Sequence, residues 1–390
     1  MPTRRKSLTA TDATATAIGK AAFAEWRFDD AEAELRAALA AEPENFEAKA
    51  YLARTLDALG KSDDAIALYR KALDVQPDNA ATHLLLAQAL LTAGHYAEGW
   101  DEYEWRYKGE SGQPFPNIDA PLWDGEPLDG RTLLVVGEQG FGDVLQFVRL
   151  LALVKALGGG GKLSLACSAP LARLLDGVPG VDHLFQDWRR AGAFDCFCPL
   201  SSLPRVLGLT ADTIPADVPY ITADPRQVRR WEKRLGQTDA KRIGLCWAGR
   251  PTHPNDRYRS LPFDLLNRAL PRGPTYVSLQ KGERATDVAG SRVKDLSPRL
   301  HDFADTAAVL ENLDLVITVD TSIAHLAGAM GKPVWVLVPY VPDWRWGRDE
   351  ETTPWYPTAH LFRQIAPKDW QSVVAAISDS IDRWLLARPL

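Results

Sequence analysis

A repeat with a period of 34 residues constrains the N-terminal part of this 390-residue chain more than any other feature. Shifting the sequence by 34 positions aligns identical residues between a first and a second unit, and a further shift extends the match into a third unit that ends near residue 107. Such units bury a continuous core only by stacking on one another, which predicts an α-helical solenoid over residues 12–107. The matching pairs are Asp29 and Asp63, Ala31 and Ala65, Ala38 and Ala72, Pro43 and Pro77, Asn45 and Asn79, Leu52 and Leu86, and Gly60 and Gly94.

The pattern resembles the tetratricopeptide repeat. Small residues such as Ala31 and Ala38 let paired helices approach closely, and Pro43 ends the second helix of a pair. The third unit departs from the alanine pattern at Gly99 and Arg106. Solenoids of this kind use their concave face to bind extended polypeptide, so the resemblance implies a protein partner; the alternative is a purely structural array.

Charge is divided unevenly along the chain. Residues 29–104 contain sixteen Asp and Glu against six Lys and Arg, a net of −10, whereas the whole chain has a net charge of −6. The remainder is therefore mildly basic at +4, which suits a small anion. Duplex binding needs a strongly basic face, so nucleic acid is not expected as a partner.

The cysteine content and the apolar runs indicate a cytoplasmic protein. Four cysteines in a chain of this length do not make a disulfide framework. The apolar stretches stop well short of the ~20 residues of a membrane span, so no transmembrane segment is expected. The basic first residues lead into Thr, Ala and Asp without a leucine-rich segment, so no secretion signal is expected.

After a Pro- and Gly-rich linker at residues 108–130, short apolar runs alternate with helical stretches. This alternation predicts two parallel α/β domains, at residues 131–222 and 241–366, followed by a C-terminal helix at 367–390. The expected strands are residues 132–136, 162–167, 243–247, 276–279, 315–319 and 334–338, and the expected helices are residues 144–157, 261–269, 304–313 and 322–330.

Three loops that follow strands carry the candidate chemistry. The first, residues 137–143, contains Gly140, Gly142 and Asp143 directly before a helix. Its glycines let a substrate approach the backbone, but the spacing lacks the last glycine of a dinucleotide fingerprint. Asp143 is either a helix cap or a carboxylate that takes a proton from an attacking hydroxyl.

The second loop, residues 247–260, gathers three arginines, among them Arg257 and Arg259. Guanidinium groups bind phosphate in a bidentate manner, so this loop is a candidate anion site as well as a possible solvated surface. Lys281, after another expected strand, is a second candidate for donor binding or a solvated turn residue.

The third loop brings Asp320, Thr321 and Ser322 to the start of a helix, where exposed amides and hydroxyls favour an anion. His325, one turn further on, either packs in the core or faces the same ligand.

Together these loops resemble glycosyltransferase family 9, the heptosyltransferase-like group, over about residues 130–365. The resemblance implies a GT-B fold of two Rossmann-like domains and a nucleotide-sugar donor, usually ADP-heptose. It also implies that Asp143 is the catalytic aspartate and that Arg259 stands where the family has a phosphate-neutralising lysine. The matching donor loop holds Asp320, Thr321, Ser322 and His325, with Ser322 in place of a common glycine.

The chain is therefore expected to be an inverting, metal-independent glycosyltransferase without a cofactor. Fusion to repeats is similar to that in O-linked N-acetylglucosamine transferases, which by analogy suggests a protein acceptor. Two alternatives remain: an adaptor that binds a nucleotide sugar without turnover, and a lipopolysaccharide-core heptosyltransferase-like enzyme, which would normally have a basic membrane-facing surface.

Overall fold

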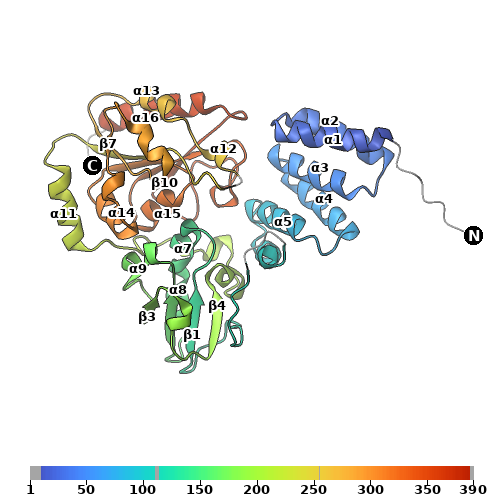
Figure 1. Cartoon of the computed structure of the whole chain (residues 1–390). Coiled ribbons are helices and arrows are strands. Elements are labelled where there is room, and N and C mark those ends of the chain that lie inside the picture. Colours follow the sequence, from blue (N-terminus) through green and yellow to red (C-terminus); the bar gives the residue numbers. More distant parts are fainter. Residues whose placement is uncertain (1–9, 110–113, 254, 387–390) are drawn as a thin grey trace, which may run out of the picture. The chain divides into compact units, whose positions relative to one another are not determined.

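The computed structural model describes residues 10–109, 114–253 and 255–386, which cluster into two compact units (Figure 1). The repeat unit holds the described residues up to Phe115 together with Asp343–Arg348, and the α/β unit holds Pro116–Pro342 and the described residues from Asp349 onward. Residues 110–113 of the predicted linker, residue 254 of the second loop and residues 387–390 of the predicted last helix lie outside the described residues.

The repeat unit consists of helical hairpins whose repeated residues form caps and turns. Asn45 accepts a hydrogen bond from the N–H of Ala48 at 2.9 Å, and Asn79 accepts one from Thr82 at 3.0 Å. Gly60 adopts a positive φ of 78° after the first helix of its hairpin, a conformation that favours glycine. The helices are α1 (Ala10–Ala24), α2 (Phe28–Ala41), α3 (Phe46–Ala58), α4 (Ser62–Val75), α5 (Ala80–Thr92), α6 (Tyr96–Tyr103) and the 3-10 helix η1 (Glu104–Tyr107).

The small repeated residues explain the packing of the hairpins. Ala31 and Ala65 are fully buried where paired helices cross. At the equivalent position of the third hairpin, a Cβ on Gly99 would lie 2.8 Å from Cδ2 of Leu91, so α5 and α6 approach more closely than a side chain would allow. The third unit thus keeps the repeat fold although its alanine pattern is lost.

A short segment from the C-terminal half of the sequence belongs to the repeat unit. The 3-10 helix η8 (Trp344–Trp346) is buried, and the Trp344 ring meets Trp100 edge-to-face at 5.3 Å between centroids. The Nη2 of Arg348 lies 3.6 Å from Oδ1 of Asp57. Burial raises the pKa of Asp57, and the nearby guanidinium offsets part of this rise. The structure therefore differs from the expected division, which placed residues 343–348 inside the domain at 241–366.

The first sheet of the α/β unit is parallel, with strand order β3-β2-β1-β4. Part of the predicted linker packs against it, because Leu122 forms a bridge with Phe197 and the neighbouring Trp123 is buried. The strands are β1 (Thr132–Val136), β2 (Lys162–Ala166), β3 (His183–Phe185) and β4 (Cys196–Pro199).

The second sheet is also parallel, with strand order β10-β9-β8-β5-β6-β7. Its central strands are buried on both faces, as expected for a parallel sheet between helices. On one face, Leu266 and Val373 from two covering helices join the core of Ile243 and Ile317. The strands are β5 (Arg242–Cys246), β6 (Thr275–Ser278), β7 (Lys294–Asp295), β8 (Leu315–Val319), β9 (Val334–Val338) and β10 (Ala359–Arg363).

Helices connect the parallel strands within each sheet, which confirms the predicted fold class: a helical repeat region followed by a Rossmann-like α/β region with two parallel sheets. The α-helices of the α/β unit are α7 (Phe141–Phe147), α8 (Leu151–Ala156), α9 (Ala169–Leu175), α10 (Leu203–Val206), α11 (Pro225–Leu235), α12 (Asp256–Arg259), α13 (Phe263–Ala269), α14 (Phe303–Leu310), α15 (Ser322–Ala329) and α16 (Trp370–Leu386).

Candidate active site

The order of the second sheet changes direction between β5 and β8, which pair in parallel with Cys246 opposite Thr318. Open parallel sheets bind ligands beyond the carboxyl ends of their strands at such a point, because the connecting loops diverge to opposite faces there. The loops that follow these two strands are residues 247–260 and the turn at Asp320. The structure therefore brings the second and third predicted loops to one edge of the sheet.

Arg259 is held at this edge over a glycine. A Cβ on Gly249 would lie 2.5 Å from Nη2 of Arg259, so the guanidinium occupies space that only glycine leaves open. The Arg259 side chain is 15% exposed, and its Nε lies 3.8 Å from Oδ1 of buried Asp256. Asp256 in turn accepts a hydrogen bond from Ser260 at 2.9 Å. This arrangement holds the Arg259 guanidinium at the sheet edge without a close ion pair.

The other predicted cations have different surroundings. Arg257 is exposed, with its Cζ 4.3 Å from the centroid of the Tyr258 ring. Lys281 donates hydrogen bonds to the carbonyls of Ser297 at 2.7 Å and Leu300 at 2.8 Å, which fastens its ammonium group to a neighbouring loop. Sequence reasoning missed Arg284, whose Nη2 lies 3.8 Å from Asp256 and gives that carboxylate a second cation.

Gln280 and Cys246 fix the backbone of the arginine loop, and sequence reasoning assigned neither a role. The Gln280 carbonyl oxygen accepts from the N–H groups of Trp247 at 3.1 Å and Ala248 at 2.9 Å. The Cys246 sulfur lies 3.7 Å from the hydroxyl of Thr321, which links the two loops. Burial raises the pKa of Cys246, so this thiol stays neutral near pH 7.

The third loop ends in the N-cap of α15. The hydroxyl of Thr321 accepts from the N–H of Ile323 at 3.2 Å, and Ser322 is the first residue of the helix. Asp320, Thr321 and Ser322 are all partly exposed. The start of α15 therefore presents amide dipoles beside two hydroxyls, an arrangement that favours an anion.

Asp143 lies in the first turn of α7, after β1 of the first sheet. Its Oδ2 accepts a hydrogen bond from the N–H of Gly140 at 2.9 Å, so the carboxylate does act as a helix cap. Asp143 is also partly exposed. Sequence reasoning passed over the buried Glu138, both of whose carboxylate oxygens lie 3.3 Å from the N–H of Ser201 after β4.

Helices α7 and α15 pack against each other and join the two sheets of the α/β unit. A Cβ on Gly142 would lie 2.7 Å from Cδ2 of His325, so glycine is needed for this contact. His325 is 5% exposed, and its Nδ1 lies 2.8 Å from the hydroxyl of Tyr356. Gly142 belongs to the first predicted loop and His325 to the third, so these loops are in contact. Asp143 is the residue directly after Gly142.

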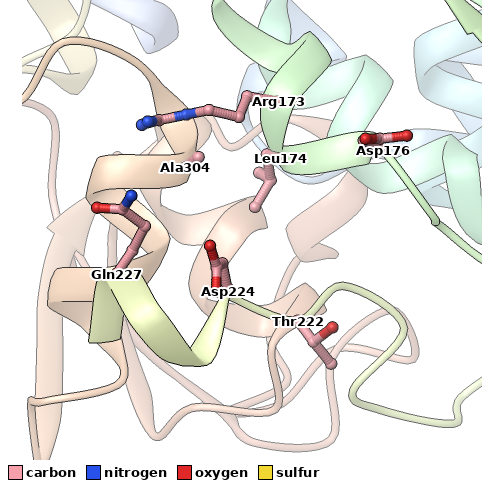
Figure 2. Close-up of a pocket in the computed structure, with 7 residues that line it drawn as sticks. All are labelled: Arg173, Leu174, Asp176, Thr222, Asp224, Gln227 and Ala304. Carbon is pink, nitrogen blue, oxygen red and sulfur yellow. The ribbon is translucent and has the colours of Figure 1, made fainter. Parts of the chain in front are cut away.

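A pocket of about 260 Å³ lies elsewhere in the α/β unit (Figure 2). Arg173 on its rim also binds Asp302 at 2.7 Å. None of the predicted site residues lines this pocket. Its lining comes from α9 and the residue after it, from α11 and the segment leading into it, and from α14. The lining residues are Arg173, Leu174, Asp176, Thr222, Asp224, Gln227 and Ala304.

Metal-binding clusters and membrane-spanning helices are both absent from the described residues. No group of three or more His, Cys, Asp or Glu side chains is arranged there to hold a metal ion. None of the helices found there has the length and apolar character needed to cross a membrane.

The chain therefore combines helical repeats with a two-sheet α/β region in which helix α7, after β1, packs against helix α15, after β8. Residues 252–368 match glycosyltransferase family 9 (heptosyltransferase), and residues 16–74 and 52–105 match the tetratricopeptide repeat. The chain thus carries N-terminal tetratricopeptide repeats followed by a heptosyltransferase-like glycosyltransferase family 9 domain.

Individual relatives show more limited similarity. The chain is 28% identical over 326 residues to protein FlbA of Caulobacter vibrioides; the match covers 76% of this chain and 54% of FlbA, so the chain spans about half the length of this curated relative. A glycosyl transferase family 9 structure from Veillonella parvula is 12% identical with a TM-score of 0.49, over 69% of this chain and 99% of that one. The E. coli ADP-heptose lps heptosyltransferase II is 13% identical with a TM-score of 0.48, over 65% and 98% respectively.

Proposed function

We propose that this protein is an inverting glycosyltransferase that moves a sugar from a nucleotide-sugar donor to an acceptor presented by its repeats. The observation that supports this most is the packing of Gly142 on His325, which lies beside both Asp143 and the start of α15. In this proposal the base lies on α7 and the anion site at the start of α15, two helices that are in contact. The family 9 match to residues 252–368 supports glycosyl transfer as the reaction.

In this proposal the donor diphosphate lies at the start of α15. The amides and hydroxyls of Thr321 and Ser322 bind its oxygens, and Arg259 balances the charge that develops as the diphosphate leaves. Asp320 and His325 support the same loop, while Arg257 and Lys281 are secondary donor-binding candidates. These groups act on the leaving group without a metal ion.

Asp143 acts as the general base. Its carboxylate takes the proton from an acceptor hydroxyl as that oxygen attacks the anomeric carbon of the sugar. The bond between this carbon and the diphosphate oxygen breaks, and its electron pair leaves with the diphosphate. A single displacement of this kind inverts the configuration at the anomeric carbon.

The donor class can be identified by thermal stabilisation with a panel of ADP-, UDP- and GDP-sugars, including ADP-heptose. A ligand present at 100 times its Kd stabilises the folded state by about 2.7 kcal/mol, which a melting curve detects. Release of nucleotide diphosphate from the stabilising donor then tests for an enzyme. Stabilisation without any hydrolysis or transfer would favour a non-catalytic adaptor instead.

Arg259→Ala is expected to weaken binding of a nucleotide diphosphate by ~10-fold or more, because a charge-assisted hydrogen bond contributes about 1.5–3 kcal/mol. Binding of the matching nucleoside should change by less than about twofold, since it lacks the phosphates. Isothermal titration with ADP and adenosine, or with the nucleotide and nucleoside that the panel selects, measures both effects. Equal losses for the two ligands would show that Arg259 only supports the fold.

The acceptor is proposed to be a protein segment of basic or mixed charge. Residues 29–104 have a net charge of −10, so they attract such a segment, and salt should slow its association. Transfer to lysine-rich and glutamate-rich peptides that share one Ser and one Thr, at low and high salt, tests this. Preference for the glutamate-rich peptide would contradict it.

All four cysteines are buried thiols, which suits the cytoplasm as the place of action.

A further inference from the structure

Arg149, two residues after the end of α7, is a buried cation that the proposed chemistry does not use. The residue is 4% exposed. Within the described residues its Nε and Nη2 have no hydrogen-bond partner, and no carboxylate forms an ion pair with it. Arginine is almost never buried to this extent without a carboxylate partner, because removal of the charge from water costs several kcal/mol.

The contacts that Arg149 does make come from the segments around the second sheet. Its Nη1 donates to the carbonyl of Trp355 at 2.6 Å. Its Cζ lies 4.3 Å from the centroid of the Tyr220 ring and 5.2 Å from that of Tyr356. A planar guanidinium can stack on aromatic faces and still donate in its own plane, so this box of two rings and a carbonyl fits arginine better than lysine.

The same two tyrosines contact the helices of the candidate site. The hydroxyl of Tyr356 bonds His325 on α15. The hydroxyl of Tyr220 donates to the carbonyl of Leu145 on α7 at 2.9 Å, and the Tyr220 N–H donates to the carbonyl of Ala329 at the end of α15. Both tyrosines are therefore hydrogen-bonded to α15, and Tyr220 is also hydrogen-bonded to α7.

We propose that Arg149 is a positioning residue that holds α7, with Asp143, against α15, with the donor loop at its start. This inference rests on the proposed function. The guanidinium contacts Tyr356, which is hydrogen-bonded to His325 on α15. The backbone of Arg149 continues directly from the end of α7, so the residue connects the two helices. Because reacting groups must be aligned closely, a shift of about 1 Å between these helices can lower the rate ~100-fold.

The test compares Arg149→Met and Arg149→Lys in the full chain, with Arg189→Met as the matched control. Arg189 is an exposed residue of the 3-10 helix η3 (Trp188–Arg190) in the same unit. Arg149→Met leaves no carboxylate unpaired and removes a buried charge, so its melting temperature should stay within about 3 °C of the original chain. Hydrogen exchange of peptides from residues 137–147 and 321–329 should nevertheless become ~5-fold faster or more.

The kinetic readout uses ADP-heptose, or the sugar nucleotide that the panel selects. Arg149→Met should lower kcat by ~10- to 100-fold and change the donor KM by less than about threefold, because the donor-binding groups themselves remain. Arg149→Lys, which keeps the charge and the bond to Trp355 but not the planar stacking, should recover part of kcat. Arg189→Met should match the original chain in every measurement.

Three results would overturn the inference. Unchanged exchange in both peptides would show that Arg149 does not hold the helices. Unchanged kcat in an active enzyme would show that their position does not depend on it. A melting temperature that falls by 10 °C or more in parallel with kcat would indicate a purely structural role. If no sugar nucleotide is turned over by the original chain, the proposed function fails, while the exchange measurement still decides whether Arg149 holds the helices.

Discussion

Replacement of Asp143 by asparagine is expected to lower the rate of sugar transfer by ~10²- to 10⁴-fold and to leave the fold unchanged. The carbonyl oxygen of the new amide can still accept the hydrogen bond that the N–H of Gly140 gives to Asp143 at 2.9 Å. The amide cannot take a proton from an attacking hydroxyl. This one substitution therefore removes the proposed base but keeps the helix cap. The rate of sugar transfer is measured at a saturating concentration of donor.

The matched control is Asp224→Asn, because Asp224 caps α11 by accepting from the N–H of Arg226 at 2.8 Å. The same loss of charge at a helix start away from the candidate site should leave turnover unchanged. Donor binding should also be unchanged in Asp143→Asn, since the donor groups lie after β5 and β8. Full turnover in Asp143→Asn would remove the aspartate from the proposed mechanism and leave it as a cap.

The central strands of both sheets could be predicted from sequence almost to the residue. The expected ranges 132–136, 315–319 and 334–338 coincide with β1, β8 and β9, because buried parallel strands are continuous apolar runs. The short strands β3, β4, β7 and β10 were missed. The strands β3, β4 and β7 have only two to four residues, which carry too little pattern to stand out, and β4 also ends in Pro199. The strand β10 is as long as β1, but its residues Ala359–Arg363 mix polar and apolar side chains and do not form a continuous apolar run.

The missed β4 matters for the candidate site. It pairs with β1 on the side opposite β2, so the first sheet also changes direction beside the loop that leads to Asp143. Sequence reasoning found that loop from its glycines, but the position of Ser201 against Glu138 depends on a strand pairing 63 positions away. Side chains that support a loop from another strand could not be predicted from the loop itself.

Buried charge was the second feature that the sequence did not reveal. Arg149 falls in the expected helix 144–157, and the local pattern does not show that its side chain is buried. Its carbonyl partner, Trp355, lies 206 positions later. For Lys281 the sequence likewise indicates either donor binding or a solvated turn, whereas its ammonium group donates to two backbone carbonyls. The sequence identifies the charged residues, but tertiary contacts determine whether each charge is buried, paired or exposed.

For the same reason, sequence could not show that residues 343–348 belong to the repeat unit: their contacts are with residues far away in the chain. The two tryptophans at its centre, Trp344 and Trp346, are 5% and 1% exposed and pack within a unit formed by residues more than 200 positions earlier. Removal of the repeats would leave these side chains without the unit that buries them. Tests of the repeats are for this reason best made with substitutions in the full chain.

Trp344→Ala is expected to destabilise the repeat unit by about 3–5 kcal/mol, the usual range for deletion of a buried tryptophan side chain. The Trp344 ring meets Trp100 of α6 edge-to-face at 5.3 Å, and η8 packs on α5. A short helical array depends on contacts between neighbouring repeats and on a covered terminal repeat, so the loss should fall first on the third hairpin. Hydrogen exchange of peptides from residues 80–103 should therefore accelerate before any change appears at residues 28–58.

The conservative variant Trp344→Phe keeps an aromatic edge against Trp100 and should recover more than half of the lost stability, because edge-to-face pairs and most of the buried area survive. Exchange in the strands β5 and β8 of the α/β unit serves as the internal reference and should not change in either variant. Equal acceleration in both units would mean that Trp344 stabilises the whole chain. Unchanged exchange in residues 80–103 would mean that η8 contributes nothing to the repeats, and the small third hairpin would then have to be stable on its own contacts among α5, α6 and η1.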